Sequence, residues 1–270
     1  MIGLPATSTM RAAPPASRCV SRFAAGFATR SGYSPVSTVE GVLFDYGQTL
    51  VTFAYPEREL LEVIRNFRPT IEEALGAPAP PAEVILENVF LPLERYVSSE
   101  SEDEVDWLEV VKASWESAGL SLPDGLLYEI VDAEQMCWDR IVSVDGDATS
   151  VLSLLRSRGI RRAICSNAPF PPEMMNRQVQ TNGIGELMDG VVFSSMVGRR
   201  KPAPEIFRAA LDVLGVPAER VLFVGNLVRE DYEGPRALGM RAVICDAHNP
   251  EPAPNGVPSI ARLSELTQLL

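Results

Sequence analysis

The feature that most constrains the fold of this chain is a series of short apolar segments separated by stretches with helical periodicity. Residues 149–160, 172–181 and 204–215 are predicted to be helices, and Gly159 and Gly215 end two of them. Strands that are apolar on both faces are typical of a parallel sheet covered by helices on both sides. We therefore predict an α/β fold with a doubly wound, Rossmann-like parallel sheet, whose strands lie at 42–44, 161–167, 189–195, 220–226 and 241–246.

A long stretch without strands interrupts this alternation after the first strand. Residues 57–140 carry apolar residues at helical spacing in successive segments, and Gly119, Pro123 and Gly125 punctuate them. We interpret this stretch as a helical insert that leaves the α/β core and returns to it. The last residues, 260–270, are predicted to form an amphipathic C-terminal helix.

The first 39 residues differ in composition from the rest of the chain. They contain four arginines and many alanines and serines but no acid, which is the bias of an organellar transit peptide. A disordered leader or an upstream start codon explains the same bias, so residues 1–39 are left out of the fold prediction. The cysteines lack a CxxC spacing and favour a reducing compartment. We expect a cytoplasmic protein, or an organellar one if the leader is a transit peptide.

Composition argues against several classes of function. A formal net charge of −12 argues against a nucleic-acid partner, because a phosphate backbone binds to basic surfaces. No apolar run reaches the ~18–20 residues that cross a bilayer, so no membrane partner is expected. The single histidine, His248, lies in a proline-rich loop, which disfavours His-based triads and zinc sites. The sequence leaves both a monomer and a homodimer open.

Polar side chains follow the predicted strands at the points where the strands end. Alone, each has an ordinary explanation, since acids occur in turns, Ser-Asn caps helices and lysine lies on surfaces. The carboxyl ends of parallel strands meet at one edge of a sheet, where open α/β folds bind ligands, so these side chains are expected to converge. The series is Asp45, Ser166 with Asn167, Lys201, and Asn226 with Glu230 and Asp231.

The order of these residues resembles that of the haloacid dehalogenase-like (HAD) superfamily over residues 40–270. The motifs that carry the resemblance are DxxxT at 45–49, Ser166-Asn167, Lys201-Pro202 within RRKPAPEIFRAALDVLGV, and Gly225-Asn226 with Asp231, followed by DYEGPRALGMRAVICD. The resemblance implies a hydrolase, most simply a phosphatase of a small phosphorylated metabolite. It also implies that the insert is a helical C1-type cap at 52–145 on a core formed by 40–51 and 146–270.

The resemblance assigns a covalent mechanism to the strand ends. Asp45 would attack a phosphoryl group and form an aspartyl-phosphate, which water then hydrolyses. Ser166 and Asn167 would bind phosphoryl oxygens, and Lys201 would offset the negative charge of substrate and nucleophile. Thr49 would orient the nucleophile loop by hydrogen bonding.

The cofactor implied by the resemblance is Mg²⁺, which prefers hard oxygen ligands and usually keeps several waters. It would be held by the Asp45 carboxylate, by the backbone carbonyl of Gly47 and by the fourth motif. In that motif the candidate ligands are Asn226 and Asp231, with Glu230 as a further candidate.

Two positions depart from the family pattern. Family phosphatases usually have an aspartate that acts as general acid and base where this chain has Gly47. Loss of such a group typically costs ~10²–10⁴-fold in rate. Asn226 replaces another usual aspartate, and it offers a metal an amide oxygen without charge.

These departures leave other functions open. One is a metal-independent 2-haloacid dehalogenase, although the aromatic residue typical of that group at the place of Gly47 and its Ser-rich fourth motif are not seen. Another is phosphonate hydrolysis through a cap lysine, for which Lys112 is the only candidate in the insert. A third is a catalytically weak relative that serves as a binding or interaction protein.

Overall fold

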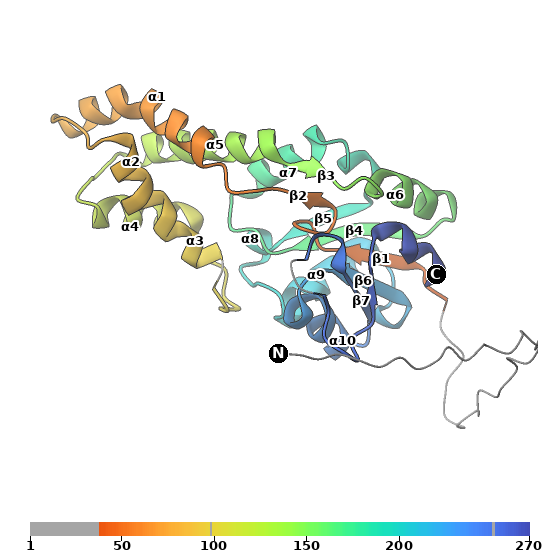
Figure 1. Cartoon of the computed structure of the whole chain (residues 1–270). Helices are drawn as coiled ribbons and strands as arrows, with labels where there is room; N and C mark the ends of the chain where they lie inside the picture. Colours follow the sequence, from red (N-terminus) through yellow and green to blue (C-terminus); the bar gives the residue numbers. More distant parts are fainter. Residues whose placement is uncertain (1–37, 98, 250–251) are drawn as a thin grey trace, which may run out of the picture. The chain divides into compact units, whose positions relative to one another are not determined.

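A parallel sheet is the centre of the protein, as predicted, and in the described residues it has six strands where five were predicted. The computed structural model describes residues 38–97, 99–249 and 252–270, so almost all of the predicted leader at 1–39 lies outside the described residues. The strand order is β5-β4-β1-β6-β7-β8, and every neighbouring pair is parallel (Figure 1). The strands are β1 (Gly41–Phe44), β4 (Arg161–Ser166), β5 (Gly190–Phe193), β6 (Val221–Gly225), β7 (Arg241–Cys245) and β8 (Ser259–Ile260).

Helices cover both faces of this sheet, which explains why its strands are apolar throughout. Side chains alternate between the two faces of a strand, so Val42 and Phe44 of β1 pack into one apolar cluster and Leu43 into another. Figure 1 shows α6 and α7 on one side of the sheet and α9 and α10 on the other. These helices are α6 (Ala148–Ser157), α7 (Pro172–Thr181), α9 (Pro204–Leu214) and α10 (Gly234–Ala237).

The ends of two of these helices were predicted correctly from their glycines. α6 is followed by Gly159 and α9 by Gly215, with φ angles of 72° and 68°. This left-handed conformation favours glycine, since a side chain would clash there. Short helices complete the core: η2 (Gly185–Leu187), α8 (Ser194–Val197), η3 (Ala218–Arg220), η4 (Val228–Glu233) and η5 (Asp246–His248).

The predicted helical insert begins and ends at a small antiparallel pair of strands. The chain leaves the core through β2 (Val51–Thr52) and returns through β3 (Ser143–Val144), and these two strands pair with each other. The insert packs around its own apolar cluster, which includes Trp107 and Trp115. Its helices are α1 (Glu57–Leu75), α2 (Ala82–Ile85), the π-helix η1 (Leu86–Phe90), α3 (Leu91–Val97), α4 (Trp107–Ser117) and α5 (Asp124–Ile141). No helix in the described ranges has the length and apolar composition to span a membrane.

The prediction of a C-terminal α-helix at 260–270 is wrong. Ser259 and Ile260 instead form β8, which pairs with β7 and extends the sheet by one strand. The 3₁₀ helix η6 (Leu263–Gln268) follows it, and Leu263 and Leu266 are buried in the core cluster. These leucines are three residues apart and a 3₁₀ helix has three residues per turn, so this conformation places both on the core.

Candidate active site

Four loops meet at the carboxyl edge of the sheet, and each contributes a polar side chain. Asp45 follows β1 directly, Ser166 is the last residue of β4, and Asn226 follows β6. Because β1 lies between β4 and β6 in the sheet, these ends are adjacent. Lys201 lies in the segment that follows β5 and α8. The strand order therefore brings together the residues that the sequence placed at one edge.

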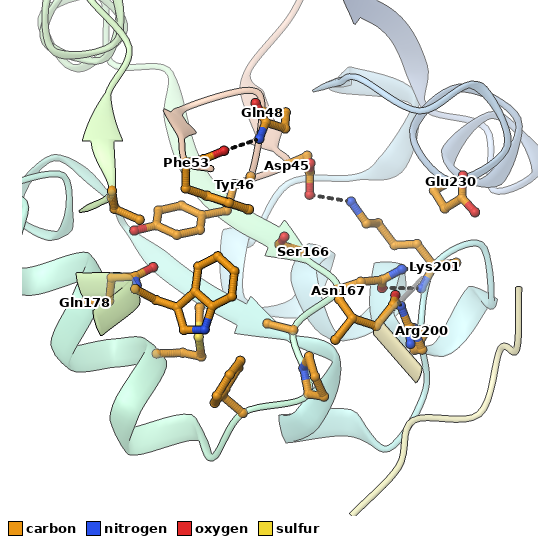
Figure 2. A pocket seen from close by; sticks show the side chains of 18 of the residues that line it. Asp45, Tyr46, Gln48, Phe53, Ser166, Asn167, Gln178, Arg200, Lys201 and Glu230 are labelled. Carbon is orange, nitrogen blue, oxygen red and sulfur yellow. Dashed lines mark hydrogen bonds and ion pairs between the residues drawn. The ribbon is translucent and has the colours of Figure 1, made fainter. Parts of the chain in front are cut away.

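Lys201 is the central charge of the site. Its Nζ lies 2.6 Å from Asp45 Oδ1 and 2.6 Å from Asp231 Oδ1, and all three side chains are buried. Figure 2 shows the Asp45 and Lys201 side chains pointing toward each other. Burial lowers the pKa of Lys201, but the Asp231 and Asp45 carboxylates outweigh this and raise the pKa above its ordinary value. These two carboxylates therefore favour the charged form of Lys201 beside Asp45.

Asp231 connects Lys201 to the loop that follows β6. Its Oδ1 accepts from Lys201, and its Oδ2 accepts from the backbone N–H groups of Asn226 and Leu227, each at 2.9 Å. Burial raises the pKa of Asp231 to about 6, although Lys201 counteracts this rise. A Cβ at Gly225 would lie 2.3 Å from the Asp231 carboxyl carbon, so glycine is required there for the close approach.

Asn167 holds the backbone of Lys201 with both ends of its side-chain amide. Its Oδ1 accepts from Lys201 N at 2.7 Å, and its Nδ2 donates to Lys201 O at 3.2 Å. Ser166 and Asn167 both line the cavity in front of Asp45 (Figure 2). This double contact fixes the segment that carries the cation, a role that the sequence did not reveal.

The turn after Asp45 lacks one expected hydrogen bond and has an aromatic ring as a neighbour. Thr49 is fully buried, but its Oγ1 has no hydrogen-bond partner among the described residues, so the expected hydrogen bond that orients the loop is not formed. At Gly47 a Cβ would lie 3.2 Å from the ring of Phe53. Gln48 has φ of 55° and donates from Nε2 to the Phe53 carbonyl at 3.2 Å. The space where family phosphatases are expected to have a second acid is bordered here by an aromatic ring.

The fourth motif presents two side chains to the cavity. Asn226 and Glu230 line it, whereas Asp231 does not. The Oδ1 atom of Asn226 is buried without a hydrogen-bond partner among the described residues, while its Nδ2 donates to Asn249 Oδ1 at 3.2 Å. Glu230 lies 3.3 Å from the Arg229 guanidinium.

The cavity has a volume of about 360 Å³ and lies between the core and the insert. Pockets for small molecules are typically of this size or larger and combine apolar walls with a few polar groups. The insert contributes residues that the sequence did not single out, among them Glu94, Trp107, Glu134 and Trp138. Lys112 does not line the cavity and pairs with Asp124 at 2.8 Å, so phosphonate chemistry through this lysine has no support.

The fold is a doubly wound α/β core that brings the Asp45, Ser166 and Lys201 side chains together at the carboxyl edge of its sheet, and sequence comparison shows the family to which this arrangement belongs. The family model of haloacid dehalogenase-like hydrolases matches residues 39–239. The chain therefore belongs to the haloacid dehalogenase-like hydrolase family.

Curated relatives with assigned activities match only part of the chain. It is 32% identical over 113 residues to a phosphoserine phosphatase from Thermus thermophilus, covering 40% of this chain and 45% of that protein. It is 34% identical over 102 residues to a phosphoglycolate phosphatase from Rhodospirillum rubrum, covering 38% and 41%. A longer alignment is to a relative named only for its family, the haloacid dehalogenase-like hydrolase domain-containing protein 3 of Bos taurus, with 31% identity over 170 residues, 61% of this chain and 65% of that protein. The alignments to the two phosphatases span less than half of those relatives' length.

Solved structures share the fold at low sequence identity. A HAD phosphatase from Thermococcus onnurineus superposes with a TM-score of 0.59 at 21% identity, over 86% of this chain and 97% of that chain. A 2-haloacid dehalogenase from Pseudomonas syringae pv. Tomato gives a TM-score of 0.61 at 18% identity, over 86% and 98%. The fold is thus common to phosphatases and dehalogenases and does not separate the two reactions.

Proposed function

We propose that this protein is a Mg²⁺-dependent phosphatase of a small phosphorylated metabolite, with Asp45 as the nucleophile. The observation that carries the proposal is the buried contact of Lys201 with both Asp45 and Asp231 at the edge of the cavity. Lysine here can offset the charge that builds up when a carboxylate attacks a phosphoryl group. The phosphatase activities assigned to curated relatives support the same reaction.

In this mechanism each residue has a distinct task. Asp45 attacks phosphorus, the bond to the leaving oxygen breaks, and an aspartyl-phosphate forms; water then hydrolyses it and restores the carboxylate. Ser166 and the backbone N–H groups beside it bind phosphoryl oxygens. Lys201 neutralises charge, while Asn167 and Asp231 hold Lys201 in place.

The donor set fits a Mg²⁺ ion. Asn226 Oδ1 is a buried oxygen without a partner, and Asp45 offers its second carboxylate oxygen. We assign these two, the Gly47 carbonyl and Glu230 as the groups that would hold the ion; Asp231 takes part indirectly, because both of its oxygens are occupied. No group of three or more acidic, His or Cys side chains in the described ranges is arranged for a metal, so water would complete the shell, as is usual for Mg²⁺. When bound, the ion would neutralise phosphoryl charge.

The insert, residues 52–145, is proposed to act as a cap over the nucleophile. It supplies one side of the cavity and contacts the core segment that carries Lys201, since Arg200 donates to the carbonyls of Tyr96 and Val97 at 2.7 and 2.6 Å. Glu104 of the insert also forms a short hydrogen bond with Ser194. A cap in this position would exclude water and select the substrate.

The test of this proposal is a turnover panel with and without Mg²⁺. The full chain is assayed on p-nitrophenyl phosphate, on small phosphorylated metabolites and on 2-haloacids, in excess EDTA and in Mg²⁺. We expect phosphate release only in Mg²⁺ and no halide release. Turnover that is unaffected by EDTA would contradict the metal assignment, and no phosphate release from any ester would contradict the phosphatase.

The missing acid at Gly47 leads to a specific prediction. Gly47→Asp should raise kcat on an alkyl phosphate such as propyl phosphate by ~10-fold or more, because a general acid then protonates the poor leaving group. The gain on p-nitrophenyl phosphate should be smaller, since that leaving group needs no proton. The Phe53 ring has to move by a few tenths of an ångström to admit the new side chain. Gly47→Asn is the matched control, and an equal effect of both substitutions would exclude the acid role.

A second function, haloacid dehalogenation, is favoured by one observation. The Phe53 ring borders the position of Gly47, so an aromatic group is present in space although the sequence has none at that position. In this reaction Asp45 would displace halide from carbon and form an ester that water hydrolyses, without a metal. Halide release from 2-haloacids in EDTA would select this alternative. Absence of turnover on the whole panel would favour the remaining hypothesis, a catalytically weak relative that serves as a binding or interaction protein.

A further inference from the structure

The insert's side of the cavity holds a glutamate with one buried carboxyl oxygen that has no hydrogen-bond partner among the described residues. Glu134 lies on α5, is 5% exposed and lines the same cavity as Asp45. Its Oε2 has no hydrogen-bond partner among the described residues. A buried carboxyl oxygen with no partner is destabilising, so this position is best satisfied by a proton or by a ligand that donates to it.

A second acid faces the same region. Glu94 on α3 also lines the cavity, and burial raises its pKa. Burial raises the pKa of Glu134 to about 8; the charge of Glu94 adds to this rise, and the nearby Trp138 side chain offsets part of it. Glu94 thus raises the proton affinity of Glu134, and both acids lie on the insert's side of the cavity.

The cations of the cavity lie on its opposite side. Among the described residues, only Arg200 and Lys201 bring positive charge to the cavity wall, and both belong to the core. No lysine or arginine of the described insert lines the cavity, and the insert's Lys112 pairs with Asp124 away from it. Among the described residues that line the cavity, Glu94 and Glu134 therefore have no cation on their own side, whereas on the core's side Lys201 is shared by Asp45 and Asp231.

Aromatic side chains border the acidic side. Trp138 and Phe53 both line the cavity, with ring centroids 5.7 Å apart in an edge-to-face arrangement. Tyr55 packs on Trp138 in the same manner at 5.8 Å. Aromatic faces attract cations, and the attraction is stronger where water is excluded.

We propose that Glu134, together with Glu94 and the Trp138 ring, binds an ammonium group, so that the substrates are small phosphomonoesters that also carry an amine. This inference rests on the proposed phosphatase function, with the phosphoryl group at Asp45 and Lys201 and the amine at the insert. An ammonium satisfies both acids at once, because it has three donors and a positive charge. A hydroxyl supplies one donor and no charge, so it fits the pair less well.

The test compares three esters of nearly equal size: 2-aminoethyl phosphate, 2-hydroxyethyl phosphate and propyl phosphate. We expect kcat/KM for the amine to exceed that for propyl phosphate by ~10-fold or more, with the hydroxyl ester between them. Glu134→Gln should reduce the ratio of amine to propyl ester to near one. Glu129→Gln, an exposed glutamate on the same helix that does not line the cavity, should keep the ratio.

The outcomes separate this inference from the proposed function. Hydrolysis of all three esters with equal kcat/KM overturns the amine site and leaves the phosphatase in place. If no ester is hydrolysed, calorimetry of the full chain with 2-aminoethyl phosphate and propyl phosphate decides. Tighter binding of the amine ester that Glu134→Gln removes supports the site, whereas equal binding, or no binding of either ester, overturns it.

Discussion

Asp45→Asn is expected to reduce kcat by on the order of 10⁴-fold or more while leaving the protein folded, because an amide cannot form the covalent intermediate. The substitution keeps the size of the side chain, and its amide oxygen can still accept from Lys201, which retains Asp231 as a partner. The three groups change from a net charge of −1 to zero. We therefore expect an unfolding temperature equal to or above that of the wild type, as is common when an active-site charge is removed.

A matched substitution at the amino ends of the strands should lower stability and leave turnover unchanged. Asp189 precedes β5 and accepts from the backbone N–H of Arg162 at 2.8 Å, and it pairs with the guanidinium of that residue at 3.0 Å. Asp189→Asn should lower the unfolding temperature and keep kcat. The measurements are steady-state turnover and thermal unfolding of both variants. Retention of more than ~1% of kcat by Asp45→Asn would exclude Asp45 as the nucleophile.

The fold of the core could be predicted because its signals are local. β1 and β6 are apolar throughout, as burial on both faces requires, and their ends are fixed by a change to polar residues at Asp45 and Asn226. The convergence of Asp45, Ser166 and Lys201 followed from one further rule, that parallel strands present their carboxyl ends at the same edge. The prediction of an α-helix at the C-terminus failed because the spacing of its leucines suits an α-helix and a 3₁₀ helix equally. The pairing of β8 with β7 takes the first residues of the segment into the sheet.

The insert's contribution to the site could not be predicted, because it depends on tertiary packing. Glu134 and Trp138 lie four residues apart on one face of α5, a spacing that an exposed pair would share. Only the structure shows that this face borders the cavity. The same holds for Phe53 beside Gly47: the sequence shows a missing acid, and the neighbouring ring becomes visible only when the turn is folded.

Lys201→Met is expected to lower the free energy of unfolding by about 3–5 kcal/mol at pH 8 and to reduce kcat by ~10²-fold or more. Methionine fills a similar volume but leaves Asp45 and Asp231 buried without their shared cation. The chain has only two lysines, so Lys112→Met is the natural control. Lys112 forms an exposed pair with Asp124, and such pairs contribute little to stability, so Lys112→Met should leave both the free energy of unfolding and kcat nearly unchanged.

The loss of stability in Lys201→Met should depend on pH in a defined direction. Burial already raises the pKa of Asp231 to about 6 with Lys201 present, and removal of the cation raises it further. A carboxyl with a raised pKa in the folded state favours folding at low pH, and that contribution is lost as the pH rises through the folded-state pKa. The deficit relative to the wild type should therefore be largest at pH 8 and clearly smaller at pH 5, as measured by urea unfolding.

The double variant Lys201→Met/Asp231→Asn separates stability from catalysis. Removing the second charge should recover a large part of the lost free energy, because one buried carboxylate then remains in place of two facing ones. It should not recover kcat, since the cation beside Asp45 is still absent. Equal stability of the single and double variants at pH 8 would show that Asp231 and Lys201 are not coupled. Recovered turnover would show that Lys201 acts on the fold and not on the reaction.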